Sequence, residues 1–429
     1  MKEELLEKIA LLVEAREEEL LNLLTKLVAF PTVSPPARNT NSVQEFINRY
    51  LIDLGFQTDK WDVYPGDPNV VGILPGESPE QFNSLIVNGH VDVAEVGDDN
   101  EWMSSPFQTF VMDGYVYGRG VADMKGGMAA ALFAIKLLKD LGVTLGGDLQ
   151  IQSVIGEEVG EAGTQACVER GYSSDYAVVV DTSDLHIQGQ GGVITGWITI
   201  QSKVTHHDGI RRNMIHAGGG VKGASAIEKM MKIIAGLQEL ERHWAVTKKY
   251  EGFPPGANTI NPAVIEGGRH AAFVADRCAL WVTVHFYPNE DYEEVITEIE
   301  QHIGAVAAAD PWLRENPPEF VWGGKSMIVD RGEIFPSLEI DRNHLGTKAL
   351  TRSFEHILTK QPTLGMSTTV TDAGWLGRAG IPTAIFGPGK LEDAHAVNEK
   401  LDIQQLLDFT KVLAVFIADW CNKRKEERE

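Results

Sequence analysis

The residue types that bind metal ions occur in this chain where apolar, strand-like segments end. The five candidates are two histidines and three acids: His90, Asp123, Glu158, Asp181 and His395. Imidazole nitrogens and carboxylate oxygens are ligands that zinc prefers. Two imidazoles and three carboxylates suit a pair of zinc ions that share one bridging carboxylate, and such pairs catalyse hydrolysis. The sequence therefore predicts a two-zinc site with hydrolytic chemistry.

Asp92 follows His90 by two positions, after the apolar run 84–89. Residues two apart on a strand face the same way. We therefore expect Asp92 to hold the imidazole of His90 and to set its tautomer. The simpler alternative is a pair at a strand end that makes surface hydrogen bonds.

Glycines surround Asp123, at positions Gly118, Gly120, Gly126 and Gly127. Glycine lets the backbone fold tightly around an ion, and a carboxylate in such a loop can bridge two cations. Taken alone, a turn aspartate paired with Lys125 explains the segment more simply.

Two adjacent acids, Glu157 and Glu158, follow the apolar run 149–156. Adjacent side chains diverge, so Glu158 can bind a metal while Glu157 faces a substrate. Glu157 would then accept a proton from the attacking water and pass it to the leaving nitrogen. Two solvated glutamates are the alternative, which the apolar run makes less attractive.

Asp181 ends the apolar run 176–180, where it could equally cap the next element. His395 stands in a loop, where a lone histidine is more often structural than a ligand. Each of these residues alone is a modest signal, and their joint appearance in this order is what predicts the site.

Strands and helices alternate around these residues, with strands expected near 148–155 and 176–181 and a helix over 126–141. This alternation predicts an α/β fold with a mostly parallel sheet covered on both faces. Sites in such sheets gather at the carboxyl ends of the strands. A second pattern of two helices and about four strands interrupts the first. We therefore predict a catalytic zinc-binding domain over 1–190 and 330–429 and an inserted α+β domain over 191–329. The leucine spacing also predicts one long helix over 3–30.

The charge and composition of the chain limit the kinds of partner that the protein can bind. A net charge of -23, from 38 basic and 61 acidic residues, argues against nucleic acid and anionic membranes. No segment reaches the ~20 apolar residues of a membrane span, and the charged N-terminus lacks a signal-peptide pattern. Three scattered cysteines fit a reducing compartment. We expect a cytoplasmic protein with a small-molecule substrate.

The order of motifs resembles the co-catalytic zinc family of acetylornithine deacetylase, succinyl-diaminopimelate desuccinylase, aminoacylase and glutamate carboxypeptidase. The matching pieces cover nearly the whole chain: Gly89–Asp92, Trp102–Phe107, Tyr117–Gly120, Asp123–Gly127, Glu157–Glu158, Thr371–Ala373, Phe386–Gly389, His395 and Asn398–Glu399.

The resemblance implies a role for each candidate. His90, Asp123 and Asp181 would hold one zinc ion, and Asp123, Glu158 and His395 the other. Glu157 would be the general base, with Asp92 orienting His90. Cobalt or manganese could replace zinc in a site of oxygen and nitrogen ligands. The inserted segment 191–329 would be a lid and dimerisation domain.

Two features of the inserted segment bear on the substrate. The family's lid histidine, often donated by the second subunit of a dimer, polarises the scissile carbonyl, and its best match is His206, directly before His207. We therefore expect a homodimer. Many members also have an arginine that clamps the substrate carboxylate, where this chain has His285. Histidine cannot provide arginine's bidentate grip.

The leading hypothesis is therefore hydrolysis of a small N-acyl amino acid, as in acetylornithine deacetylase. The first alternative, strengthened by His285, is deformylation of an N-formyl aminopyrimidine, and a dipeptidase or carboxypeptidase comes next. An inactive metal-binding scaffold is least favoured, because Glu157 and all five candidate ligands are present.

Overall fold

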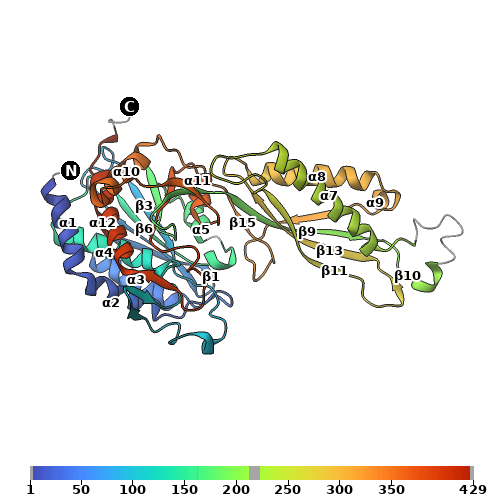
Figure 1. Ribbon diagram of the computed structural model, residues 1–429, viewed down its shortest axis with the longest axis horizontal. Coiled ribbons are helices and arrows are strands. Elements are labelled where there is room, and N and C mark those ends of the chain that lie inside the picture. The colour runs from blue at the N-terminus through green and yellow to red at the C-terminus, as the bar shows by residue number, and fades with distance from the viewer. Residues whose placement is uncertain (1–2, 162, 212–222, 426–429) are drawn as a thin grey trace. The chain divides into compact units, whose positions relative to one another are not determined.

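The computed structural model describes residues 3–161, 163–211 and 223–425 (Figure 1). The chain divides into two compact units, one of residues 1–190 and 338–429 and the other of residues 191–337. The second boundary thus lies later in the chain than the expected 329/330. The assignment of the inserted unit as a lid and dimerisation domain stays a prediction.

The first unit contains the elements that carry the candidate ligands. Its α-helices are α1 (Glu3–Ala15), α2 (Glu17–Val28), α3 (Asn41–Asp53), α4 (Lys125–Asp140), α5 (Gly163–Glu169), α10 (Leu345–Leu358), α11 (Ala373–Arg378) and α12 (Ile403–Trp420). Its strands are β1 (Gln57–Tyr64), β2 (Asp67–Leu74), β3 (Leu85–His90), β4 (Phe110–Met112), β5 (Tyr115–Tyr117), β6 (Leu149–Val154), β7 (Tyr176–Val179), β8 (Ile187–Gln190), β16 (Leu364–Ser367), β17 (Thr383–Ile385) and β18 (Lys400–Asp402). The 3₁₀ turns η1 (Asp99–Glu101) and η2 (Glu157–Val159) lie between them.

The main sheet has the strand order β1-β2-β6-β3-β7-β17-β8-β16. Its centre is parallel, since β3 pairs in parallel with β6 and β7, and β17 with β7. Antiparallel β1 and β2 form one edge. The predicted α/β fold with a mostly parallel sheet is confirmed.

Helices cover both faces of this sheet because its central strands are apolar on both sides. On β3, Leu85 and Val87 join the core cluster that contains α1, α2, α3, α4, α10 and α12, whereas Ile86 joins the cluster of α11. Figure 1 shows α5 and α11 on the other side of β3 and β6 from α4 and α12.

The single long helix predicted over 3–30 is wrong, because the chain breaks at Arg16 into α1 and α2. Arg16 leaves helical geometry with φ -117° and ψ 22°. Its side chain binds Glu19 at 2.6 Å and Asp140 at 2.8 Å. The break lets α1 pack on α12 while α2 packs on α4. Both helices keep the leucine spacing, which therefore could not reveal the break.

One glycine brings α4 close to the end of β7. A Cβ atom at Gly127 would lie 1.9 Å from the carbonyl oxygen of Val180, so only glycine fits there. The start of α4, which begins two residues after Asp123, is thereby held against the segment that leads into Asp181. The close packing of these two main-chain segments thus brings the candidate ligands Asp123 and Asp181 together.

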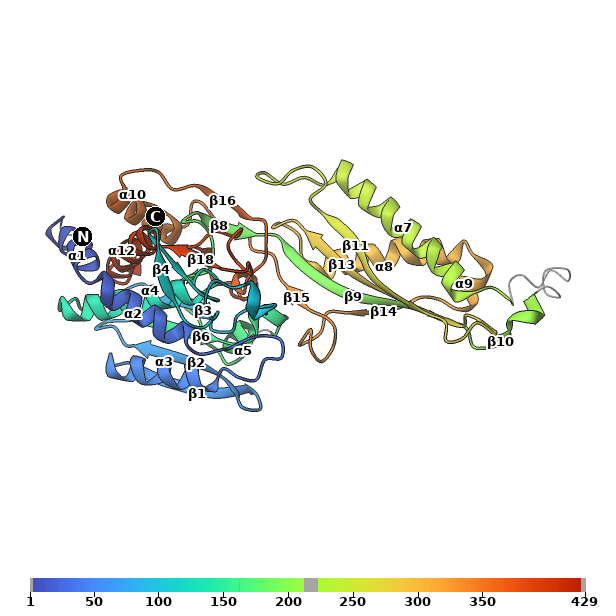
Figure 2. The same ribbon diagram turned by 60° about the horizontal axis from the view of Figure 1, so that its bottom comes forward.

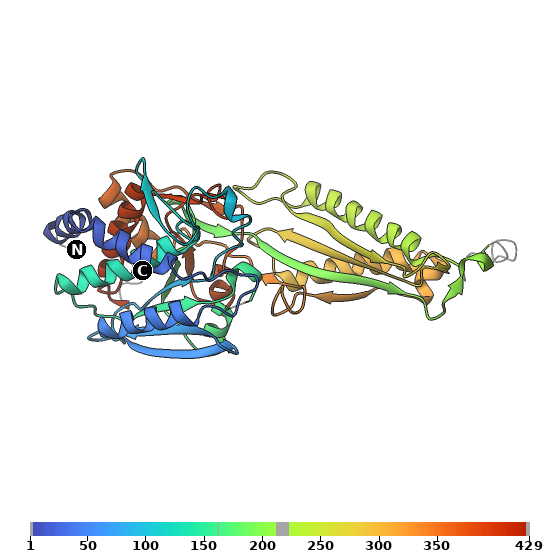
Figure 3. The same cartoon turned by 90° about the horizontal axis from the view of Figure 1, so that it is seen from below.

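The second unit is a sheet with helices on one face (Figures 2 and 3). Its elements are β9 (Gly192–Gln201), β10 (His206–His207), η3 (Asp208–Ile210), α7 (Ala226–Thr247), β11 (Thr259–Gly267), β12 (Phe273–Val274), β13 (Arg277–Phe286), α8 (Tyr292–Ala308), α9 (Pro311–Glu315), β14 (Glu319–Trp322) and β15 (Ile334–Phe335). The sheet order is β11-β13-β9-β14, with β15 also pairing with β9. Inward side chains of β9 and β13, such as Ile198 and Val282, share a core with α7 and α8.

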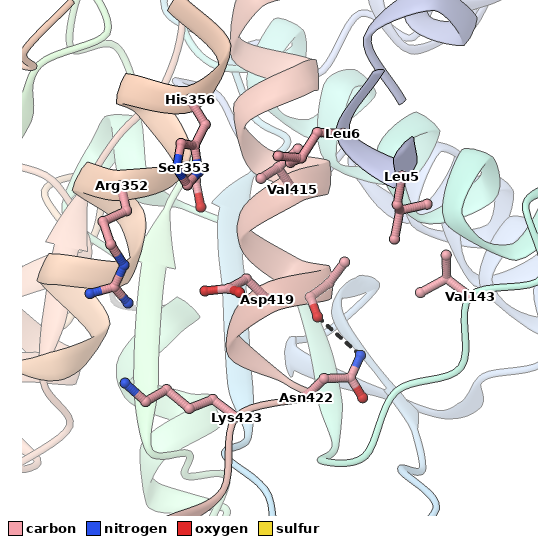
Figure 4. A pocket seen from close by; sticks show the side chains of 11 residues that line it. Leu5, Leu6, Val143, Arg352, Ser353, His356, Val415, Asp419, Asn422 and Lys423 are labelled. Carbon is pink, nitrogen blue, oxygen red and sulfur yellow. Dashed lines mark hydrogen bonds between the residues drawn. The ribbon is translucent and has the colours of Figure 1, made fainter. Parts of the chain in front are cut away.

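A cavity of about 590 Å³ lies between α1, α10 and α12 (Figure 4). Leu5 and Leu6 line it on α1, Arg352 on α10 and Asp419 on α12. The candidate ligands do not line it, so it is separate from the predicted metal site. Among the described helices, none has the length and apolar character needed to cross a bilayer.

Candidate active site

The five predicted ligands lie together in the first unit. His90 is the last residue of β3, Glu158 lies in η2 after β6, and Asp181 follows β7. Asp123 stands in the turn before α4, and His395 in the loop between β17 and β18. Because β3, β6 and β7 are parallel, their carboxyl ends meet at one edge of the sheet, as predicted.

Asp123 lies between the two imidazoles. Its Oδ1 is 3.2 Å from Nε2 of His90, and its Oδ2 is 3.4 Å from Nε2 of His395. One carboxylate therefore presents a different oxygen to each histidine. This is the arrangement that a bridging ligand between two cations requires.

Each of the other two acids lies near a different histidine. Asp181 Oδ2 lies 3.9 Å from Nε2 of His90, and Glu158 Oε2 lies 2.8 Å from Nε2 of His395. Oε1 of Glu158 is buried and has no hydrogen-bond partner among the described residues. Donor atoms of His90, Asp123 and Glu158 lie within 4.8 Å of one another. These residues fit a metal ion, which would also satisfy the orphaned oxygen.

Burial and mutual charge shift the pKa values of these ligands. Burial and the charge of Asp123 raise the pKa of Asp181 to about 7, and the same two causes raise that of Glu158 to about 7. Hydrogen bonds to Asp123 and Glu158 raise the pKa of His395 to about 10. Metal binding requires ionised carboxylates and neutral imidazoles. A bound divalent cation would therefore lower the pKa values of Asp181 and Glu158 and that of His395.

The carboxyl group of Glu157 approaches His90, with its Oε2 3.8 Å from Nε2 of that histidine. Burial raises its pKa well above the usual glutamate range, and the acids Asp181 and Glu158 add to the effect. A carboxyl group with a raised proton affinity, placed beside the candidate ligands, has the properties of a general base that must later release its proton as an acid.

Asp92 lies beside His90, but its carboxylate is not the nearest partner of the ring. Nδ1 of His90 lies 3.0 Å from the main-chain oxygen of Asp92 and 3.6 Å from Oδ1. The carboxylate instead accepts hydrogen bonds from the amides of Gly156, at 2.9 Å, and Glu158, at 3.1 Å. Asp92 thus ties the turn that carries Glu157 and Glu158 to the end of β3.

His206 belongs to the second unit, where β10 pairs with β12 and His206 stands opposite Val274. His207 is exposed, and its Nδ1 accepts a hydrogen bond from the amide of Gly209 at 3.1 Å. His285 lies on β13, opposite Thr259 of β11.

Sequence reasoning assigned no chemical role to Arg119 or Glu399, although both lie in the matching motifs. They form a buried ion pair of 2.8 Å beside the candidate ligands. The two residues are 280 positions apart in the chain, so no local pattern could pair them.

The model of peptidase family M20/M25/M40 matches residues 86–419 of this chain, which contain all five candidate ligands. The chain belongs to this peptidase family. The M20 match confirms the resemblance drawn from the sequence motifs.

Curated relatives within the M20 family differ in how similar they are to this chain. The N-formyl-4-amino-5-aminomethyl-2-methylpyrimidine deformylase of Bacillus subtilis (strain 168) is 60% identical over 415 residues, covering 97% of both chains. The acetylornithine deacetylase of Erwinia tasmaniensis is 25% identical over 417 residues, covering 94% of this chain and 98% of its own. The Bacillus subtilis YXEP protein, a dinuclear metal-binding M20 peptidase, aligns with a TM-score of 0.64 and 17% identity, covering 95% of this chain and 99% of its own.

The M20 family match and the deformylase relative together show a metal-dependent amidohydrolase. The predicted class of enzyme and the general fold are confirmed. The comparisons favour the alternative, deformylation, over the leading acetylornithine-deacetylase hypothesis, since the two identities are 60% and 25%.

Proposed function

We propose that this enzyme hydrolyses the formyl amide of an N-formylated aminomethyl-aminopyrimidine, releasing formate and the free amine. The 60% identity to a deformylase over nearly the full length of both chains carries the proposal. The residue at position 285 supports it independently. An aminopyrimidine has no α-carboxylate, so an enzyme for it does not need the arginine that this chain replaces with His285.

Other arginines offer little as a substitute clamp. Arg211 in the second unit is engaged with Glu228 at 2.6 Å. Arg378 ends α11 in the first unit and also has interaction partners. Arg212, next to Arg211 in the chain, lies outside the described residues.

Two divalent ions would be held by the candidate ligands, one by His90, Asp123 and Asp181 and the other by Asp123, Glu158 and His395. When bound, such ions polarise the scissile carbonyl and acidify the attacking water. Zinc fits these ligands, and cobalt or manganese could replace it.

Glu157 performs the proton transfers. Its carboxylate accepts a proton from the water that attacks the formyl carbon. When the carbon–nitrogen bond breaks, the same carboxyl group gives that proton to the leaving amine nitrogen. Asp92 fixes the turn that carries Glu157 through the amides of Gly156 and Glu158.

We propose that His206, donated by the second copy in a homodimer, stabilises the developing oxyanion. We expect His206→Ala to lower kcat by about 10²- to 10³-fold, as loss of one oxyanion donor does elsewhere. His207→Ala is the matched control, since the adjacent histidine is exposed and bonds within its own turn. Steady-state kinetics of both variants make the comparison. Equal effects of the two substitutions would show that His206 has no specific role in the reaction. A fully active monomer in sedimentation would exclude donation of His206 by a second copy.

Parallel assays of the zinc-loaded protein test the substrate. The panel contains the formylaminopyrimidine, N-acetylornithine and succinyl-diaminopimelate at equal concentrations. We expect turnover of the formylaminopyrimidine alone. Turnover confined to the two amino-acid substrates would overturn the proposal and would require another group to bind their carboxylates.

A further inference from the structure

We propose that the buried ion pair of Arg119 and Glu399 is a clamp that positions the two metal ligands Asp123 and His395. The inference rests on the metal centre of the proposed function but not on the identity of the substrate. Both residues act through the ligands, so they are positioning residues and not catalytic ones.

Glu399 holds the backbone of the loop that ends in Asp123. Its Oε2 accepts hydrogen bonds from Nη1 of Arg119 at 2.8 Å and from the amide of Gly120 at 2.9 Å. Its Oε1 accepts from the amides of Ala122 at 2.8 Å and Asp123 at 3.0 Å. Each oxygen thus binds two donors of one short segment, and the last donor is the amide of the bridging ligand itself.

Arg119 reaches from the same loop to the other ligand. Its Nη2 donates to the carbonyl oxygens of Glu95 at 2.7 Å and His395 at 3.2 Å. Arg119 and Glu399 are each only 1% exposed. The guanidinium therefore connects the Asp123 loop to the main chain of His395 through a rigid, planar group.

A second connection fixes Glu399. The amide of Gly118 donates to the main-chain oxygen of Glu399 at 3.0 Å, and β18, directly after it, pairs with β5 in the register Lys400 opposite Tyr117. The loop carrying Asp123 and the loop carrying His395 therefore form one hydrogen-bonded unit.

This arrangement matters because the exposed side chain of His395 has little packing of its own: it is 57% accessible. Its distance to Asp123 Oδ2 depends on where the two main chains are held. Groups that orient metal ligands typically contribute 10- to 100-fold to metal affinity or activity. The clamp is expected to act at this scale.

Glu399→Gln tests the clamp. The glutamine side chain has nearly the same shape as the glutamate that it replaces. Its NH2 group, however, would face two N–H donors that need an acceptor. We expect the affinity for zinc, measured on metal-free protein without substrate by competition with a chromophoric chelator, to fall by about 10- to 100-fold. With Co²⁺, the visible absorption should change as the ligand geometry changes.

Asp310→Asn is the matched control. Asp310 is a buried acid that also binds two amides, of Trp312 and Leu313, together with the two cations Lys229 and Lys232, but it belongs to the second unit. We expect it to cost stability without changing zinc affinity. A folded Glu399→Gln variant with wild-type affinity for two zinc ions would overturn the clamp, as would an equal loss in the control.

A second variant covers the case in which Glu399→Gln does not fold. Arg119→Lys keeps a positive charge for Glu399 but cannot also reach the carbonyls of Glu95 and His395. We expect weaker zinc binding in this variant too, and unchanged affinity would overturn the clamp. A wild-type protein that binds no zinc would instead refute the metal centre, so the two failures are distinguishable.

Discussion

Replacing Glu157 with glutamine is expected to lower kcat by about 10²- to 10⁴-fold while the protein keeps both metal ions. The proposed reaction uses this carboxyl group twice, first as a base and then as an acid. Glutamine preserves the shape of the side chain but cannot accept the proton. Steady-state kinetics and metal analysis of the same sample measure the two quantities.

The adjacent acid supplies the control. Glu158→Gln removes a proposed ligand and should lower the metal content together with the activity. If Glu157→Gln retained wild-type turnover, the assigned base would be wrong. If it lost metal as Glu158→Gln does, Glu157 would be a ligand instead.

Replacing Asp123 with alanine is expected to remove both metal ions and nearly all activity. Asp123 offers one oxygen to each histidine, at 3.2 Å and 3.4 Å, so each proposed metal site loses a ligand. Two metal ions together supply several kcal/mol of transition-state stabilisation. Removing both ions should therefore lower the rate by at least about 10³-fold. Metal content per chain and kcat/KM measured on the same preparation test this expectation.

Asp181→Ala is the comparison for this prediction, because Asp181 lies 3.9 Å from His90 and is a proposed ligand of only one of the two metal ions. We expect about one metal ion per chain in that variant. If Asp123→Ala bound as much metal as Asp181→Ala, Asp123 would not be the bridge.

The sequence allowed the fold class to be predicted, and with it three candidate ligands that stand at the ends of apolar strands. Asp123 was predicted from its glycine-rich turn, and His395 from the order of the motifs. Parallel strands bring strand-end positions together whatever the rest of the chain does. His90, Glu158 and Asp181 are of this kind, and the structure places them at the ends of β3, β6 and β7.

Other features depend on packing between distant segments and could not be read from local patterns. Arg16, where the predicted helix breaks, pairs with Asp140, which lies far along the chain. The carboxylate of Asp92 binds amides of the next turn, which spacing along a strand cannot show. The comparisons favour the alternative substrate over the leading hypothesis, because a family pattern describes the shared metal chemistry and does not specify the substrate. His285 was the one residue that pointed to the alternative.

Release of formate is the measurement that tests the central claim most directly. The N-formyl aminopyrimidine is incubated with the zinc-loaded protein, with the protein after chelation, and with the chelated protein after zinc is restored. We predict one formate and one free amine per substrate consumed, loss of the activity on chelation, and its return with zinc. Absence of formate from the fully loaded enzyme, or formate release unaffected by chelation, would contradict a metal-dependent deformylase.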